Sequence, residues 1–110
     1  MKEITPEMVQ IRDDVLRRVC DLTGIAPQDV MSNTRRRPVV IARQMVMWAL
    51  WRHPSLSTTA IGTLMGRTHA LVLYSFEQIE FMRSKANIYK QVYDITQQIK
   101  DYGQQAHITR

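Results

Sequence analysis

The sequence predicts an all-α fold of about six helices. Only four glycines and four prolines interrupt its 110 residues, and no stretch alternates apolar and polar residues as a half-buried strand does. Apolar residues instead recur at helical spacing, most clearly at Ile88, Val92, Ile95 and Ile99. A chain of this length buries roughly 60–68% of the surface that it exposes when unfolded, so a single small domain with a true core is expected.

The first helix is expected to start at Thr5 and Pro6, a capping residue followed by a proline at the first helical position. Gly24 supplies its C-terminal stop. A short helix is expected over 26–31, and the polar, basic loop "SNTRRRP" then leads to Pro38, which suits the start of the next helix.

The segment from about 39 to 53 is apolar nearly all the way round, which predicts a helix in the middle of the domain. Trp48 and Trp51 are therefore expected to be core residues. Pro54 ends this helix.

Ser57 is expected to cap a short helix that reaches Leu64, and Gly66 interrupts it. Thr68 is expected to cap a longer helix that runs to about Met82. A short helix, a tight glycine turn and a longer helix are the outline of a helix-turn-helix, with its turn over 64–67.

The last helix is expected to start at a capping Ser84 and to close at Gly103. We interpret 1–110 as one domain with a core over about 6–102. Residues 103–110 are expected to form a flexible tail.

The net charge of +5 is unevenly distributed. Six of the ten acidic residues lie within positions 1–29, and the next one is Glu77. All charged residues between them are arginines, at positions 35, 36, 37, 43, 52 and 67. Guanidinium groups match phosphates and guanine edges with two parallel hydrogen bonds, so this acid-free middle predicts a polyanionic partner. In the alternative interpretation, some of these arginines lie over the core or in a solvated loop.

The stretch "GRTHALVLYS" at 66–75 places polar residues directly before an apolar run. In a helix-turn-helix, the start of the second helix enters the major groove, so its first residues must be polar and exposed. Free N–H groups and the helix dipole also favour phosphate there. The rest of the same helix packs on the domain.

Two stretches, "SNTRRRPVVIARQMVMWAL" and "IGTLMGRTHALVLYSFEQIE", resemble the C-terminal DNA-binding domain of the DnaA replication initiator family. The matching parts are the basic loop, Ala-Arg-Gln in a long helix, Ile-Gly, and Gly-Arg-x-His-x-x-Val-Leu. The similarity extends over about 9–99. It implies a Trp-repressor-like helical domain that binds double-stranded DNA at a short asymmetric box, in replication initiation or its regulation.

The resemblance also implies roles for single residues. Arg35 matches the arginine that enters the minor groove, Arg43 and Gln44 match backbone contacts, and Arg67 and His69 match the pair before the recognition helix. We expect Arg43, Gln44 and Arg67 to hold phosphates, and Thr68, His69 and Ala70 to face bases. The full set of candidate DNA contacts is Arg35, Arg36, Arg37, Arg43, Gln44, Thr59, Arg67, Thr68, His69, Ala70 and Leu71.

The sequence departs from the family pattern at the recognition helix. Gly66 stands where the family commonly has the second of two glycines, and Thr68 replaces an aspartate. Ala70 and Leu71 replace two hydroxyl residues, and such apolar groups can pack on a thymine methyl but cannot donate hydrogen bonds. The DNA sequence that is recognised is therefore expected to differ from the family's box or to be less strictly defined.

Two other functions remain open: a protein-interaction module on the same fold, and a transcriptional repressor with a different DNA site. No catalytic cluster and no G-x-x-x-x-G-K-[ST] loop is present, so neither an enzyme nor the initiators' ATPase module is expected. We expect no cofactor and no small-molecule substrate. No metal is expected, because the spacing of His53, His69 and His107 suits no common zinc site.

A cytoplasmic location is expected, with no membrane partner. The single Cys20 cannot form an internal disulfide, and the first residues do not resemble a signal peptide. The longest apolar run, at 45–51, is far shorter than the roughly 20 residues that span a bilayer.

Overall fold

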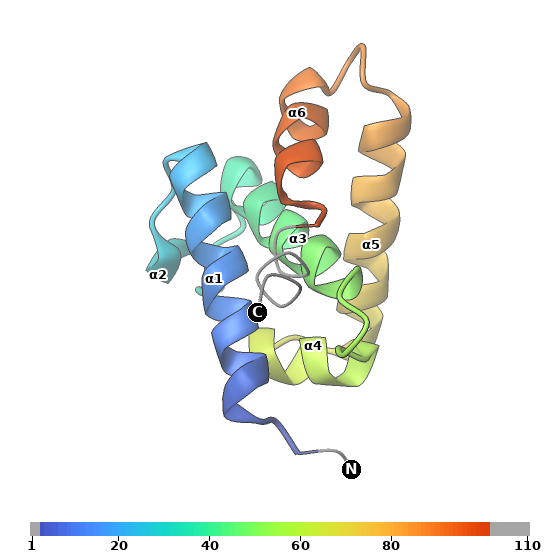
Figure 1. The fold of residues 1–110 in the computed structure, drawn as a ribbon. Coiled ribbons are helices and arrows are strands. Elements are labelled where there is room, and N and C mark those ends of the chain that lie inside the picture. Colours follow the sequence, from blue (N-terminus) through green and yellow to red (C-terminus); the bar gives the residue numbers. More distant parts are fainter. Residues whose placement is uncertain (1–2, 102–110) are drawn as a thin grey trace.

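Helix α3 (Arg37–Trp51) passes through the middle of the molecule and contacts each of the other five helices (Figure 1). This computed structural model describes residues 3–101. Every residue from Ala42 to Leu50 is buried, including Arg43 and Gln44. The prediction of a central helix, made because the segment is apolar nearly all the way round, is therefore confirmed.

Within the described part of the chain, five further helices surround α3. They are α1 (Pro6–Thr23), α2 (Pro27–Val30), α4 (Thr58–Met65), α5 (His69–Ser84) and α6 (Lys90–Ile99). The described residues contain no strand, which confirms the all-α prediction. No helix among them is both long enough and apolar enough to cross a membrane.

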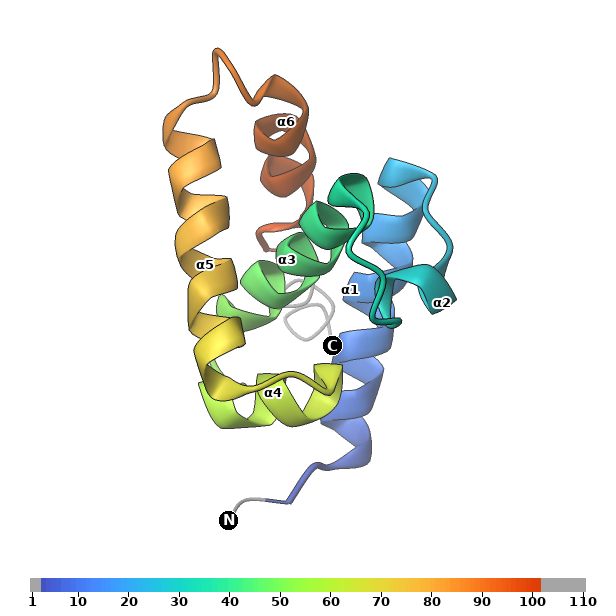
Figure 2. The same ribbon diagram turned by 180° about the vertical axis from the view of Figure 1, so that it is seen from behind.

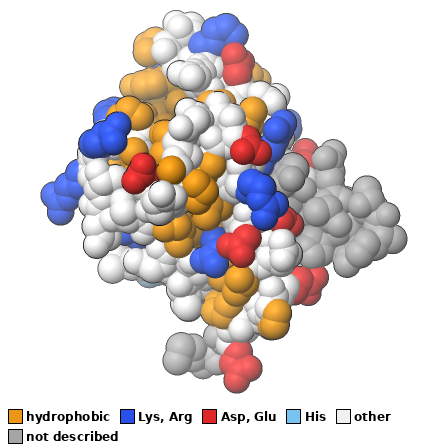
Figure 3. Space-filling view, turned by 90° about the vertical axis from the view of Figure 1, so that its left-hand side faces the viewer, with side chains coloured by type: hydrophobic (Ala, Val, Ile, Leu, Met, Phe, Trp, Pro, Cys, Tyr) orange, Lys and Arg blue, Asp and Glu red, His pale blue; other side chains and the backbone are white. Residues whose placement is uncertain are grey.

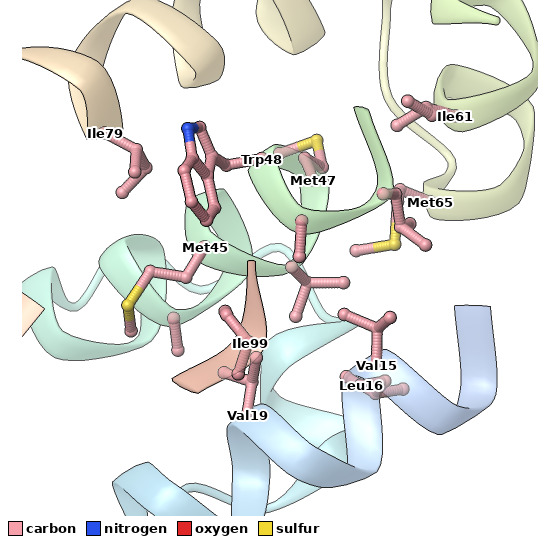
Figure 4. Close-up of a cluster of buried hydrophobic side chains, with 14 of the residues drawn as sticks. Val15, Leu16, Val19, Met45, Met47, Trp48, Ile61, Met65, Ile79 and Ile99 are labelled. Atoms are coloured by element: carbon pink, nitrogen blue, oxygen red, sulfur yellow. The ribbon is translucent and has the colours of Figure 1, made fainter. Parts of the chain in front are cut away.

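Within residues 3–101, the core combines side chains from all six helices, with Val30 contributed by α2, and Figure 4 shows part of it. Those labelled in the figure are Val15, Leu16 and Val19 of α1, Met45, Met47 and Trp48 of α3, Ile61 and Met65 of α4, Ile79 of α5 and Ile99 of α6. Methionines fill the irregular space between helices because their side chains are unbranched and flexible. Burial of these apolar surfaces fixes how α4 and α5 sit on α3.

The two tryptophans of α3 differ in environment. Trp48 is fully buried, its indole N–H donates to Oε2 of Glu80 (2.7 Å), and the guanidinium of Arg83 lies 4.9 Å from its ring centre. Trp51 is 43% exposed and stacks on Phe76 with 4.6 Å between ring centres. The expectation of a core position is confirmed for Trp48 but is wrong for Trp51, which lies in the last turn of α3.

Side-chain caps begin three of the helices as predicted. The hydroxyl of Thr5 accepts from the backbone N–H of Met8 (3.1 Å), and that of Ser57 accepts from Ala60 (3.1 Å). Thr68 caps α5 in the same way. Gly24 ends α1 in the left-handed conformation (φ 77°), where a side chain would be strained.

The start of the last helix is a wrong prediction. Ser84 does not cap α6 but ends α5, where its hydroxyl donates to the carbonyl of Phe81 (2.6 Å). Turns over 85–89 follow, and α6 starts at Lys90 without a side-chain cap. Ile88 is consequently 68% exposed rather than part of the buried stripe. The expected end at Gly103 and the tail over 103–110 lie outside the described residues.

Helices α4 and α5 form a helix-turn-helix in which Gly66, Arg67 and Thr68 make the turn. Residues 64 and 65 still belong to α4, so the turn begins two positions later than predicted. Gly66 adopts a left-handed conformation (φ 66°), and the N–H of Arg67 donates to the carbonyl of Gly62 (2.8 Å). A Cβ on Gly62 would lie 2.9 Å from the carbonyl oxygen of Arg67, so only glycine allows this close return of the chain.

We expect Gly62→Ala to destabilise the protein, although alanine is normally more favourable than glycine inside a helix by about 1 kcal/mol. The obstructing atom is backbone and cannot rotate away, so a loss of about 1–3 kcal/mol in the free energy of unfolding is expected in urea denaturation. Thr63→Ala, at the exposed neighbouring position, is the control and should change stability by less than about 0.5 kcal/mol. Equal stability of the Gly62→Ala variant and the wild type would contradict the close contact.

Candidate nucleic-acid interface

The first turn of α5 projects polar and small apolar side chains into solvent. His69, Ala70 and Leu71 are exposed, whereas Val72 is completely buried against the core. The Thr68 hydroxyl accepts from the N–H of Leu71 (3.2 Å), so its lone pair serves the helix as a cap. The remaining N–H groups of this turn and the helix dipole make the tip attractive to anions.

A shallow pocket of about 380 Å³ lies between α4 and this turn. Its lining consists of Thr58, Thr59, Gly62, Thr63, Gly66, Arg67, Thr68 and His69. Four threonines and a histidine are thus brought together, and hydroxyl and imidazole groups can bind phosphate oxygens. Of the threonines of α4 that line this pocket, Thr59 was among the predicted DNA contacts, whereas Thr58 and Thr63 were not. Thr63 could have been predicted from its spacing, because residues 59 and 63 are one helical turn apart and share a face of α4.

Arg35 and Arg36 in the basic loop between α2 and α3, and Arg37 at the first position of α3, are all exposed. Within residues 3–101, no carboxylate pairs with any of the three. The loop lies on the same side of the molecule as the turn between α4 and α5 (Figure 2). The structure therefore brings together two basic segments that are about thirty residues apart in the sequence.

Arg43 faces the interior of the protein rather than solvent. It is 7% exposed, its Nε donates to the carbonyl of Val30 (2.7 Å), and Nη2 donates to those of Thr34 (3.1 Å) and Asp29 (3.5 Å). Burial, with the nearby charge of Arg67, lowers the pKa of this guanidinium. The direct phosphate contact expected of Arg43 is not supported, because its side chain is buried and already donates to carbonyls of α2 and of the basic loop.

Gln44 is also buried, with 6% of its surface exposed. A direct phosphate contact is likewise not supported for it.

Arg67 connects the turn of the helix-turn-helix to the basic loop. Its Nη1 donates to Oδ1 of Asn33 (2.9 Å), and Nη2 donates to the carbonyls of Ser32 (2.5 Å) and Met31 (3.4 Å). Its Nε is buried and has no hydrogen-bond partner among the described residues. The loop residue Asn33 was missed in the sequence, because nothing local marks it as the partner of an arginine 34 positions away.

The face formed around α1 has a different character (Figure 3). Acidic and basic side chains are interspersed there, and an apolar strip runs between them. Two ion pairs belong to α1, Arg12 with Asp13 (2.7 Å) and Arg17 with Asp14 (3.6 Å). The positive charge of these arginines is thus compensated locally, unlike that of the basic loop.

The family described as the bacterial DnaA protein helix-turn-helix matches residues 12–79 of the chain. This match covers the basic loop, α3, α4 and most of α5. The chain belongs to this DnaA family. The sequence resemblance is thereby confirmed, and with it a domain of the DNA-binding, helix-turn-helix type.

The similar curated proteins are DnaA chromosomal replication initiator proteins. That of Gloeobacter violaceus is 38% identical over 73 residues, which are 64% of this chain and 16% of the relative. That of Picosynechococcus sp. is 31% identical over 94 residues (84% and 21%), and that of Leifsonia xyli subsp. xyli is 32% identical over 89 residues (79% and 19%). The chain therefore spans about a fifth or less of the length of these DnaA relatives.

We expect Arg43→Ala to lower the free energy of unfolding by about 2 kcal/mol, because the carbonyls of Val30 and Thr34 lose their donor in a buried setting. Urea denaturation measures this loss. Arg36→Ala removes the same charge from an exposed position, and should change stability by less than about 0.5 kcal/mol. If the two variants were equally stable, Arg43 would not hold the loop.

Proposed function

We propose that this domain binds double-stranded DNA, with the start of α5 in the major groove and the basic loop in the adjacent minor groove. The observation that carries the proposal is the location of two exposed elements, one of them basic, on one side of the molecule. These are Arg35, Arg36 and Arg37, which are all exposed, and the exposed first turn of α5. Because no carboxylate of residues 3–101 pairs with these arginines, their positive field is available to the phosphates.

Each element is assigned a different part of the duplex. Arg35 enters the minor groove, while Arg36 and Arg37 contact phosphates beside it. His69, Ala70 and Leu71 face base edges in the major groove, where each base pair presents a distinct pattern of donors, acceptors and methyl groups. Thr68 contributes as a cap and, together with Thr59, as a phosphate ligand.

The recognised sequence is proposed to be a variant of a DnaA box. The curated relatives are named chromosomal replication initiator proteins, so a role in replication initiation or its regulation is the corresponding biological proposal. Ala70 and Leu71 are exposed and offer no hydrogen-bonding group. Contacts with thymine methyl groups therefore replace polar base contacts at these positions.

A second candidate is a protein-interaction module. Leu71, Leu73 and Tyr74 are 42%, 42% and 51% exposed on α5, which is unusual for a surface that only contacts DNA. Binding to a protein through these residues would be nearly independent of salt. DNA binding loses affinity steeply as salt rises, so the same titration separates the two functions.

Fluorescence anisotropy with two duplexes, one with a DnaA box and one scrambled, tests the proposal. If about five phosphates are contacted, log K should fall against log salt with a slope of about −4.5. Salt-dependent binding without preference for the box would retain DNA binding but reject the box. Absence of binding to both duplexes would reject the proposal and favour a protein partner, whereas preference for another site would indicate a repressor.

Replacing thymines of the bound duplex one at a time by deoxyuridine tests the role of Leu71. Loss of one methyl contact, worth about 0.8 kcal/mol, should weaken binding about fourfold at one or two positions. Leu71→Ser should remove this difference between thymine and uracil. Phe81→Ser, at an exposed position near the far end of α5, should leave it unchanged. Equal sensitivity to uracil in wild type and Leu71→Ser would show that Leu71 does not read these methyl groups.

A further inference from the structure

Arg67 occupies the one position from which a side chain of the turn reaches the basic loop. Its backbone is fixed on both sides, because Gly66 ends α4, Thr68 caps α5, and its own N–H is bonded to the carbonyl of Gly62. The side chain therefore leaves the turn in a defined direction. Its guanidinium reaches residues 34 to 36 positions earlier in the chain.

The loop is held from two directions. Arg67 binds the start of the loop, at Met31, Ser32 and Asn33. Arg43 binds the carbonyls of residues 29 and 30, at the end of α2, and that of Thr34 within the loop. Together the two guanidinium groups contact every residue from 29 to 34. Arg35 follows directly after this held segment and has an exposed side chain.

The partners of Arg67 are neutral oxygens rather than carboxylates. A guanidinium bound to an amide and two carbonyls keeps its full positive charge and fixes the geometry of the loop by its planar, forked donors. A direct phosphate contact by the same donors would require these bonds to break. The contacts of Arg67 thus favour an action through the loop over an action on DNA.

We propose that Arg67 is a positioning residue that sets the distance between the two DNA-reading elements, the loop with Arg35 and the first turn of α5. The inference rests on the proposed DNA binding. In this proposal, Arg67 does not contact a phosphate as expected from the sequence, but affects DNA binding through the loop that carries Arg35. When the contact between Arg67 and the loop is lost, Arg35 is no longer held in register with the recognition helix.

A double-mutant cycle with Arg35 tests the proposal by DNA anisotropy. Arg67→Ala should weaken binding about tenfold in the wild-type background, but far less when Arg35 is already alanine, because the two residues then act as one unit. Arg36→Ala serves as the matched charge control. Its fold-change in DNA affinity should be the same with and without Arg67→Ala, because the two residues act independently. Equal effects of Arg67→Ala with and without Arg35 would overturn the proposal.

Two conservative variants separate positioning from a phosphate contact. Arg67→Lys keeps the charge but lacks the forked donors, so it should bind DNA as weakly as Arg67→Ala; a lysine that restores binding would indicate a phosphate contact. Asn33→Ala removes no charge and lies at an exposed position, yet it should also weaken binding about threefold. No effect of Asn33→Ala would contradict the proposal.

Amide hydrogen exchange gives a readout that does not depend on DNA. Arg67→Ala should accelerate exchange at 31–36 while α3 stays protected. Absence of DNA binding by the wild type would reject the proposed function but not the contact between Arg67 and the loop. Unchanged amide exchange in Arg67→Ala would reject that contact as a constraint on the loop. Accelerated exchange with additive effects on DNA binding would reject the positioning role alone.

Discussion

The burial of α3 is the constraint on which the rest of the structure depends. Because all of its residues from 42 to 50 are buried, the other helices must cover it from every side, and they can do so in few ways. That coverage places α5 along one side of α3, and Arg67, in the turn before α5, reaches the loop that precedes α3. Core packing thus determines where the candidate interface lies, and Arg43 and Arg67 hold its loop in place.

The sequence predicted the helices well where their ends are set by local chemistry. Thr5, Ser57 and Thr68 cap helices because a hydroxyl can reach an N–H three residues later whatever the rest of the fold does. Ser84 has the same chemistry but ends a helix, and only the packing of α5 against α6 distinguishes the two roles. Trp51 likewise follows the apolar pattern of α3, and the end of that helix leaves it partly exposed.

The location of the candidate interface could be predicted from the sequence. Which of its arginines are exposed and which bind other parts of the protein could not. In the sequence, Arg35, Arg43 and Arg67 all belong to the same acid-free segment. Their structural differences arise from contacts with distant residues: Arg43 bonds to carbonyls 9 to 14 positions away, and Arg67 to oxygens 34 to 36 positions away. No local spacing records such contacts. Charge pattern therefore identifies a basic surface, whereas the fold decides which charges scaffold it and which remain exposed.

The exposure of Ala70 and Leu71 has a consequence for how this domain can diverge. Both follow a cap that depends on the hydroxyl of Thr68 and precede Val72, which the core holds, so the helix start stays fixed whichever side chains stand between them. Substitutions at 70 and 71 can then alter the preferred site with little cost to folding. Copies of this domain can acquire new binding preferences one residue at a time while the scaffold remains under separate selection.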